Sequence, residues 1–369
     1  MNRMQWRLIF LAILLGMLPG LVSVSRAEAP ITGVEAKSAG FEKLWQLPVG
    51  ISGYHSDSVA RISQLGGNIY VLTRHGYMVA IRVKSGTIRW TIKLPANADS
   101  LSKPETFAKN QFMILTGGRM LIVDERTGTV VKSESLHFPN GSNPYLYGDN
   151  IFIGSLHDRM VAMSANWPPR EVWFQLDSGD SFTATPVAVA GQLVFASRQG
   201  TIFSRSITDG TGGWKRPVGG HILASPAVAG TTVYFPCTDR NVYAIDAITG
   251  VSPWITHLPG SLVFTPVIIG KHLLVPSGGV GLFSLSMKTG LRQWGPVPQG
   301  FRVVGRKGDT IYVATTHGKI VLVSLVTGHV LGAMTYNLPS VFLRNSKTPV
   351  IIMASIYGDV EALKPLPNQ

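Results

Sequence analysis

The sequence predicts an all-β fold and, within that class, an eight-bladed β-propeller built from four-stranded blades. The first observation behind this prediction is a frame that repeats with a period of about 40 residues across most of the chain. One equivalent position in each copy lies ten residues before the glycine position of its Thr-Gly or Ser-Gly turn. These positions are Gly76, Gly118, Arg159, Gly200, Arg240, Val280, Gly318 and Gly358. Such even spacing is typical of a repeat architecture.

The second observation is the strand pattern inside each copy. Apolar and polar residues alternate in residues 242–247 and 320–325, and turn residues stand on both sides of each segment. A sheet of a few short strands cannot bury both of its faces alone, so successive sheets must stack. Radial stacking into a ring gives a propeller, and a blade of about 40 residues has the size expected for one.

The third observation concerns the two ends of the chain. The last copy begins near Val350, and the sequence stops at Gln369, before an outer strand could form. Residues 41–50, which include Trp45, have the pattern of an outer strand but no blade of their own. We therefore expect this N-terminal strand to complete the C-terminal blade and to close the ring, which removes exposed sheet edges. The propeller is assigned to residues 41–369.

The N-terminus predicts export. Arg3 and Arg7 precede an apolar stretch over residues 8–18, and Ser25 and Ala27 stand at the −3 and −1 positions of a cleavage site. Residues 1–27 are interpreted as a signal peptide and residues 28–40 as a linker. Because the apolar run is shorter than the ~20 residues that a membrane-spanning helix needs, no transmembrane span is expected. The predicted location is the periplasm.

Tryptophan recurs four residues after the turn in five copies and also occurs on the closing strand. We expect each indole to lie flat over the neighbouring blade and to donate its N–H to a backbone carbonyl. Blades two and seven have Lys132 and Gly332 at this position, so their contacts with the next blade are expected to be weaker. The predicted docking residues are Trp45, Trp90, Trp173, Trp214, Trp254 and Trp294.

Residues 244–254, AIDAITGVSPW, resemble the docking motif A-x-D-x-x-T-G-x-x-x-W of quinoprotein dehydrogenases and the wider PQQ-like repeat family. Partial copies are AIRVKSGTIRW, SLSMKTGLRQW and IVDERTGTVVK. The bare eight-blade layout is most similar to BamB-type propellers, which implies a non-catalytic scaffold for envelope or outer-membrane assembly proteins, acting as a monomer within a complex. BamB-type proteins usually carry a lipid-accepting cysteine after the signal segment. This chain departs from that pattern because its single cysteine is Cys237.

The same resemblance leaves an enzymatic alternative, a PQQ-dependent dehydrogenase with calcium. Such enzymes need an acidic base and calcium ligands near the axis, and many have vicinal cysteines, which this chain lacks. Turn histidines at positions 75, 157 and 317 belong to different blades, too far apart to share a metal ion. We therefore expect no catalytic, cofactor-binding or metal-binding residue, and a buried, inert Cys237. Aspartates in or near turns form no recognisable site: Asp57, Asp99, Asp158, Asp177, Asp180, Asp239 and Asp359.

The charge of the chain gives the remaining functional signal. Loss of the signal peptide with Arg3, Arg7 and Arg26 lowers the formal net charge from +13 to +10. Basic residues gather in the turns between the second and third strands of successive blades, which share one face of a propeller. They predict a surface for an acidic partner, although exposed turn residues are also commonly just solvated. Nucleic acid is not an expected partner in the periplasm. The candidate residues are Arg74, His75, Arg119, Arg159, Arg198, Arg240 and Lys319.

Overall fold

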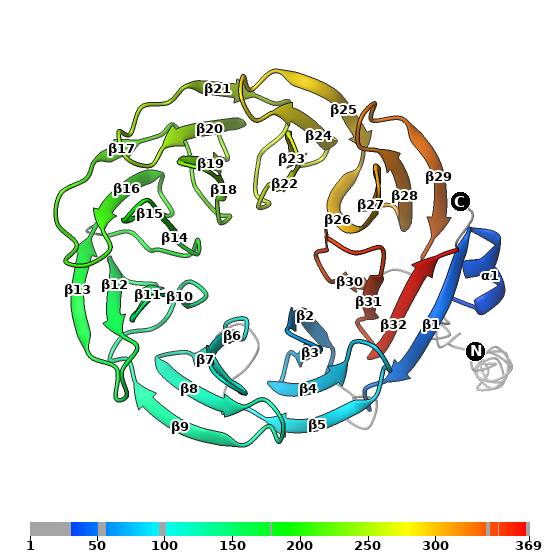
Figure 1. The fold of residues 1–369 in the computed structure, drawn as a ribbon, viewed down its shortest axis with the longest axis horizontal. Coiled ribbons are helices and arrows are strands. Elements are labelled where there is room, and N and C mark those ends of the chain that lie inside the picture. Colours follow the sequence, from blue (N-terminus) through cyan, green and yellow to red (C-terminus); the bar gives the residue numbers. More distant parts are fainter. Residues whose placement is uncertain are drawn as a thin grey trace, which may run out of the picture.

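Eight antiparallel sheets of four strands form a closed ring in this computed structural model, as Figure 1 shows. The structure describes residues 31–50, 57–95, 101–177, 179–336, 340–345 and 347–366. The predicted signal peptide and its cleavage site lie outside these residues. Among the described residues, no helix is long and apolar enough to cross a membrane. The predicted eight-bladed propeller is confirmed.

Blades 1–4 follow one another along the chain, and each runs from its inner to its outer strand. Blade 1 contains β2 (Val59–Leu65), β3 (Asn68–Thr73), β4 (Tyr77–Arg82) and β5 (Ile88–Lys93). Blade 2 contains β6 (Glu105–Ala108), β7 (Gln111–Thr116), β8 (Arg119–Asp124) and β9 (Val130–Ser135). Blade 3 contains β10 (Tyr145–Tyr147), β11 (Asn150–Gly154), β12 (Arg159–Ser164) and β13 (Glu171–Leu176). Blade 4 contains β14 (Val187–Val189), β15 (Gln192–Ala196), β16 (Thr201–Ser206) and β17 (Lys215–Pro217).

Blades 5–7 repeat this order, and blade 8 combines both ends of the chain. Blade 5 contains β18 (Ala227–Ala229), β19 (Thr232–Pro236), β20 (Asn241–Asp246) and β21 (Trp254–His257). Blade 6 contains β22 (Val267–Ile269), β23 (His272–Ser277), β24 (Gly281–Ser286) and β25 (Arg292–Pro298). Blade 7 contains β26 (Gly300–Lys307), β27 (Thr310–Thr315), β28 (Lys319–Ser324) and β29 (Val330–Thr335). Blade 8 contains β30 (Ser340–Phe342), β31 (Ile351–Ser355), β32 (Asp359–Pro365) and β1 (Phe41–Pro48).

The hydrophobic core lies between blades rather than inside any one of them. The middle strands are buried on both faces, and all six residues of β3 are buried. Tyr70 and Leu72 of blade 1 belong to the same apolar cluster as Phe112 and Ile114 of blade 2. Because each sheet covers its neighbour in this way, no blade is complete without the next one, and the ring stabilises itself by closing.

Ring closure joins the two ends of the chain. Strand β1 pairs antiparallel with β32, from Phe41 opposite Pro365 to Pro48 opposite Asp359. Phe41 has no exposed surface and its ring meets Tyr312 of blade 7 edge-on, with the ring centroids 5.5 Å apart. The N-terminal strand is therefore also part of the contact between blades 7 and 8.

A short helix precedes the closing strand. Helix α1 (Gly33–Ser38) begins with a capping box, in which Thr32 and Glu35 hydrogen-bond each other's backbone N–H. Ile31 and Ala36 are buried in the cluster that fills the junction of blades 7 and 8. The sequence assigned residues 28–40 to a linker, whereas the structure packs residues 31–40 against the ring. A helix this short has no long apolar period by which the sequence could reveal it.

Tryptophan links most neighbouring blades by one geometry. The indole N–H of Trp254 donates to the carbonyl of Met287 at 3.0 Å, and its ring covers Gly290 of the next blade. A Cβ on Gly290 would lie 2.5 Å from the ring, so the turn glycine is needed for contact as well as for its φ of +71°. The other indole N–H groups, on Trp45, Trp90, Trp173, Trp214 and Trp294, donate to Val83, Glu125, Ile207, Ala247 and Leu325 respectively.

The two junctions without this tryptophan are filled differently. In blade 2 the ammonium of Lys132 lies 5.4 Å from the ring centroid of Trp167, which belongs to a turn of blade 3. In blade 7 nothing lies within 4 Å of the position that a Cβ on Gly332 would occupy, and helix α1 supplies apolar surface at the same junction. Whether these two contacts are weaker than the rest stays a prediction.

Candidate functional site

The predicted basic residues lie on one face of the ring, which we call the basic face. It consists of the turns between the second and third strands and the connections from blade to blade. Arg159 is half-buried, and the other six predicted residues are exposed. Arg74 and His75 are neighbours in blade 1, and the other five come one each from blades 2, 3, 4, 5 and 7, so the structure distributes them around the ring instead of bringing them together.

Three of these residues are held by neighbouring side chains. The guanidinium of Arg119 donates to the hydroxyl of Ser133 at 2.8 and 3.2 Å. Arg159 lies 3.8 Å from both Asp158 and Glu171, and Nδ1 of His75 lies 3.0 Å from a carboxylate oxygen of Asp57. Acidic neighbours therefore offset part of the positive field at blades 1 and 3.

The other four cations are not held in an ion pair, although Asp158 and Asp180 line the same hollow as Arg198. Within the described part of the chain, no ion pair is formed by Arg74, Arg198, Arg240 or Lys319. Their charge is open to an approaching acidic group, although exposed cations of this kind are strongly screened by salt. Arg198 differs from the other three because it lies in a hollow of the surface.

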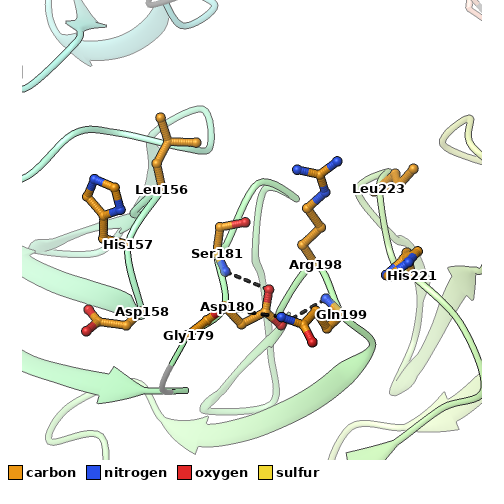
Figure 2. Close-up of a pocket in the computed structure, with 10 residues that line it drawn as sticks. All are labelled: Leu156, His157, Asp158, Gly179, Asp180, Ser181, Arg198, Gln199, His221 and Leu223. Atoms are coloured by element: carbon orange, nitrogen blue, oxygen red, sulfur yellow. Dashed lines mark hydrogen bonds between the residues drawn. The ribbon is translucent and has the colours of Figure 1, made fainter.

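This hollow, which we call the interblade hollow, spans blades 3, 4 and 5 and has a volume of about 620 Å³. In Figure 2 the Arg198 side chain extends from its turn, with Leu156 and His157 on one side and Leu223 and His221 on the other. Leu156 is 48% exposed and Leu223 is 38% exposed. An arginine between exposed leucines combines charge with apolar surface, a mixture typical of protein-binding patches.

The acidic residues at this face are used to build its turns. Asp180 accepts hydrogen bonds from the backbone N–H of Ser181 at 2.6 Å and of Gln199 at 2.8 Å, which ties the blade connection to the neighbouring turn. Asp57 does the same for Ser58 and His75 in blade 1. Burial would raise the pKa of Asp57, but hydrogen bonds, including those from Thr73 and His75, outweigh it and hold the pKa below its usual value. These carboxylates thus have structural partners.

Asp239 and Cys237 show the same structural use in blade 5. The carboxylate of Asp239 accepts the hydroxyl of Tyr243 and the backbone N–H of Asn241. Cys237 has no exposed surface, and burial raises the pKa of its thiol to about 12. The thiol is therefore neutral at physiological pH, and only a thiolate would be a nucleophile. Asp99 lies outside the described residues.

A second cavity follows the axis of the ring. This axial channel has a volume of about 640 Å³ and is lined by residues from all eight blades. Leu223 lines both the channel and the interblade hollow. Four cations line the channel from blades 1, 2, 7 and 8: Arg61, Lys103, Arg302 and Arg344. Blades 3–6 contribute uncharged polar residues instead: Asn143, Thr183, Ser225 and Thr265.

A belt of hydrogen bonds shapes part of this channel. The backbone N–H of Lys103 donates to Asn143 at 2.8 Å, and the Asn143 amide donates to the Thr185 hydroxyl at 3.1 Å. The backbone N–H of Thr185 in turn donates to the hydroxyl of Ser225 at 2.9 Å. Each residue of the belt stands directly before a proline, which keeps the chain extended at this point. The sequence analysis missed these residues, although a polar residue before proline recurs at the repeat period.

The lining of the channel does not match the ligand set of a calcium-bound PQQ cofactor. Calcium takes six to eight oxygen ligands, usually including carboxylates. No Asp or Glu is among the residues that line the channel. In the described ranges, no group of three or more His, Cys, Asp or Glu residues could hold a metal ion.

Comparison of the chain with known proteins agrees with this geometry. A crystal structure of BamB from Moraxella catarrhalis is 16% identical, with a TM-score of 0.70, and the match covers 89% of this chain and 98% of that one. Quinohemoprotein alcohol dehydrogenase from Comamonas testosteroni is 10% identical, with a TM-score of 0.67 over 91% of this chain and 78% of that one. At such identities the similarity shows the fold alone. A search of curated protein sequences found no match.

A family model adds what the structural neighbours cannot. The model described as outer membrane protein assembly factor BamB matches residues 42–216, 168–297 and 198–351, which together span most of the propeller. The chain therefore belongs to the BamB family of β-propellers.

Proposed function

We propose that this protein is an exported, non-catalytic propeller that binds other proteins during outer-membrane protein assembly, using the basic face as its docking surface. The observation that carries this proposal is the interblade hollow, where Arg198 lies between the exposed side chains of Leu156 and Leu223. Arginine is enriched among the residues that supply most of the binding energy in protein interfaces, and exposed leucines beside it add apolar area that binding can bury. Membership of the BamB family supports the choice of outer-membrane assembly as the setting.

The dehydrogenase alternative has less support in the residues. Quinoprotein neighbours share the ring, but a shared ring does not carry a shared activity. The axial channel of this chain offers cations where a calcium cofactor would need carboxylates. A scaffold needs only a surface of the right shape and charge, which the basic face supplies.

The proposal can be tested with two double variants of matched chemistry. Leu156→Asp with Arg198→Glu places acidic groups in the interblade hollow. Leu291→Asp with Lys288→Glu makes the same change of charge in the turn between β24 and β25, at the opposite face, where Leu291 is 71% exposed. Both variants should fold, since surface changes typically alter stability by about 0.5 kcal/mol or less. The measurements are crosslinked co-purification with the β-barrel assembly machinery and the amount of outer-membrane β-barrel protein in complemented cells.

We expect the hollow variant to lose co-purification and to lower the β-barrel content, while the control variant behaves as wild type. Equal behaviour of the two variants would contradict the proposed docking surface.

The location is tested separately. Mass spectrometry of the exported protein should show an N-terminus at Glu28 without a lipid, because the chain has no cysteine near the predicted cleavage site. A product that retains Met1 would contradict the signal-peptide assignment.

A further inference from the structure

Four cations line the axial channel, Arg61, Lys103, Arg302 and Arg344, and no Asp or Glu is among the described residues of its lining. The nearest acid along the chain from Lys103, Glu105, is half-buried but is not part of the lining. Charges confined between walls of low polarity focus their field, so such a channel attracts anions.

The cations are close enough to influence one another. Lys103 is exposed, but desolvation by the surrounding channel walls lowers its pKa, and the charges of Arg61, Arg344 and Arg302 lower it further. Burial and the charge of Arg302 lower the pKa of Arg344 to about 10. Desolvation and the neighbouring positive charges make the charged forms of Lys103 and Arg344 less stable than they are in water. A bound anion would stabilise these charged forms.

Two of the four cations are held in place by neutral groups. The guanidinium of Arg302 donates to the carbonyl of Phe342, and that of Arg344 donates to the carbonyl of Pro266. These bonds orient the side chains without cancelling their charge. No ion pair or hydrogen bond of the Lys103 ammonium is found within the described ranges. Donors therefore remain available around the channel.

The remaining walls suit a small organic molecule. The hydroxyls of Ser225 and Thr265 and the amide of Asn143 line the channel from blades 5, 6 and 3. The rings of Phe264 and Phe301 also line the channel, with centroids 6.1 Å apart, and add apolar surface. A volume of about 640 Å³ falls within the range of sites for small ligands and is too small for a folded domain.

We propose that the axial channel binds a small organic anion that carries two or more carboxylate or phosphate groups. The arginines and Lys103 would take the acid groups, and the hydroxyl and amide groups would take neutral oxygens of the same ligand. This site is distinct from the basic face and does not depend on the proposed protein-binding role.

The test uses citrate as a polycarboxylate probe and pyrophosphate as a phosphate probe, with KCl at matched ionic strength as the reference. Binding is measured by calorimetry and by the rise in melting temperature of the full exported chain. Lys103→Met removes one channel charge and no known hydrogen bond of the side chain. Lys109→Met is the matched control, because it makes the same change at the other end of β6, in an exposed turn.

We expect at least one probe to bind in excess of KCl, and Lys103→Met to weaken that binding about tenfold or more. The unliganded Lys103→Met protein should melt at the same or a higher temperature than wild type, since a repulsive charge is gone. A structural role for Lys103 would lower the melting temperature instead. Binding of citrate alone identifies carboxylates as the preferred groups, and binding of pyrophosphate alone identifies phosphates. Absence of binding by both probes, or equal binding by Lys103→Met and wild type, would overturn the proposal.

Discussion

Replacing Gly290 by alanine tests how much of the stability of the ring depends on tryptophan docking between blades. The new Cβ would lie 2.5 Å from Cδ2 of Trp254 and 2.6 Å from the hydroxyl of Thr256, so the indole must move. Gly290 also has a φ of +71°, which costs an alanine about 1–2 kcal/mol by itself. Displacement of the ring adds its hydrogen bond to Met287 and its apolar contact, for a total of about 3–5 kcal/mol.

Gly270→Ala separates the two contributions. Gly270 lies in the same blade with a φ of +57°, but nothing lies within 4 Å of the position that its Cβ would occupy. This variant should therefore lose only the backbone contribution of about 1–2 kcal/mol. Urea unfolding followed by circular dichroism measures both losses on the same scale.

A double-mutant cycle completes this experiment. In a Trp254→Ala background, Gly290→Ala should cost clearly less than it does in the wild type, because no ring remains to be displaced and only the contact with Thr256 and the backbone contribution are left. The docking explanation would be refuted if Gly290→Ala and Gly270→Ala were equally destabilising in the wild-type background. An unchanged cost of Gly290→Ala after removal of Trp254 would refute it as well.

Three further predictions address other parts of the molecule. Deletion of residues 41–50 should abolish cooperative melting and cause aggregation, because β32 loses its partner; an unchanged melting curve would contradict the closed ring. Cys237 should resist iodoacetamide at pH 8 in the folded protein and react fully in urea, since its pKa is raised to about 12; rapid labelling without urea would show that the thiol is accessible and activated. The pKa of Asp246 is lowered chiefly by the backbone N–H of Thr249. The stability lost in Asp246→Asn should therefore be constant above about pH 5 and vanish as the pH falls through the folded-state pKa of Asp246. Melting temperatures of both proteins measured against pH test this, and a loss of stability that does not depend on pH would exclude the carboxylate charge as its cause.

The sequence predicted the ring because the features that build it recur in most of the copies. Turn glycines, alternating strands and tryptophans are local, and each repeats at a fixed distance from the last. Closure by β1 was predictable for a related reason, since the last copy lacked one strand and the first segment had one to spare. Departures from the repeat were harder to interpret, as the pairing of Lys132 with Trp167 shows. In the junctions that have the tryptophan, its ring at the outer strand covers a glycine in the turn of the next blade. Here the aromatic ring comes from the turn, and the outer strand supplies a lysine.

The candidate sites were only partly predictable, and the reason is geometric. The basic turns could be placed on one face from strand order alone, but the sequence did not show that Leu156 and Leu223 flank Arg198. The channel cations were missed altogether. Arg61 and Arg344 are far apart in the sequence and become neighbours only when the ends of the chain close the ring. The pattern of a single copy does not reveal the channel, because its lining is assembled from residues of all eight blades.

The distribution of charge around the axis shows how such a fold can gain a specific site without losing its repeat. The contacts that hold blades together involve the buried middle strands and the tryptophans of the outer strands, whereas the channel lining comes largely from the inner strands and the connections before them. A substitution of a polar lining residue outside the apolar clusters, such as Lys103 or Asn143, therefore changes the channel with little effect on blade packing. Blades 7, 8, 1 and 2 place cations there, and blades 3–6 place hydroxyl and amide groups. Because only the first set is charged, the acid groups of a bound ligand would contact these cations, and the hydroxyl and amide groups would contact its neutral oxygens.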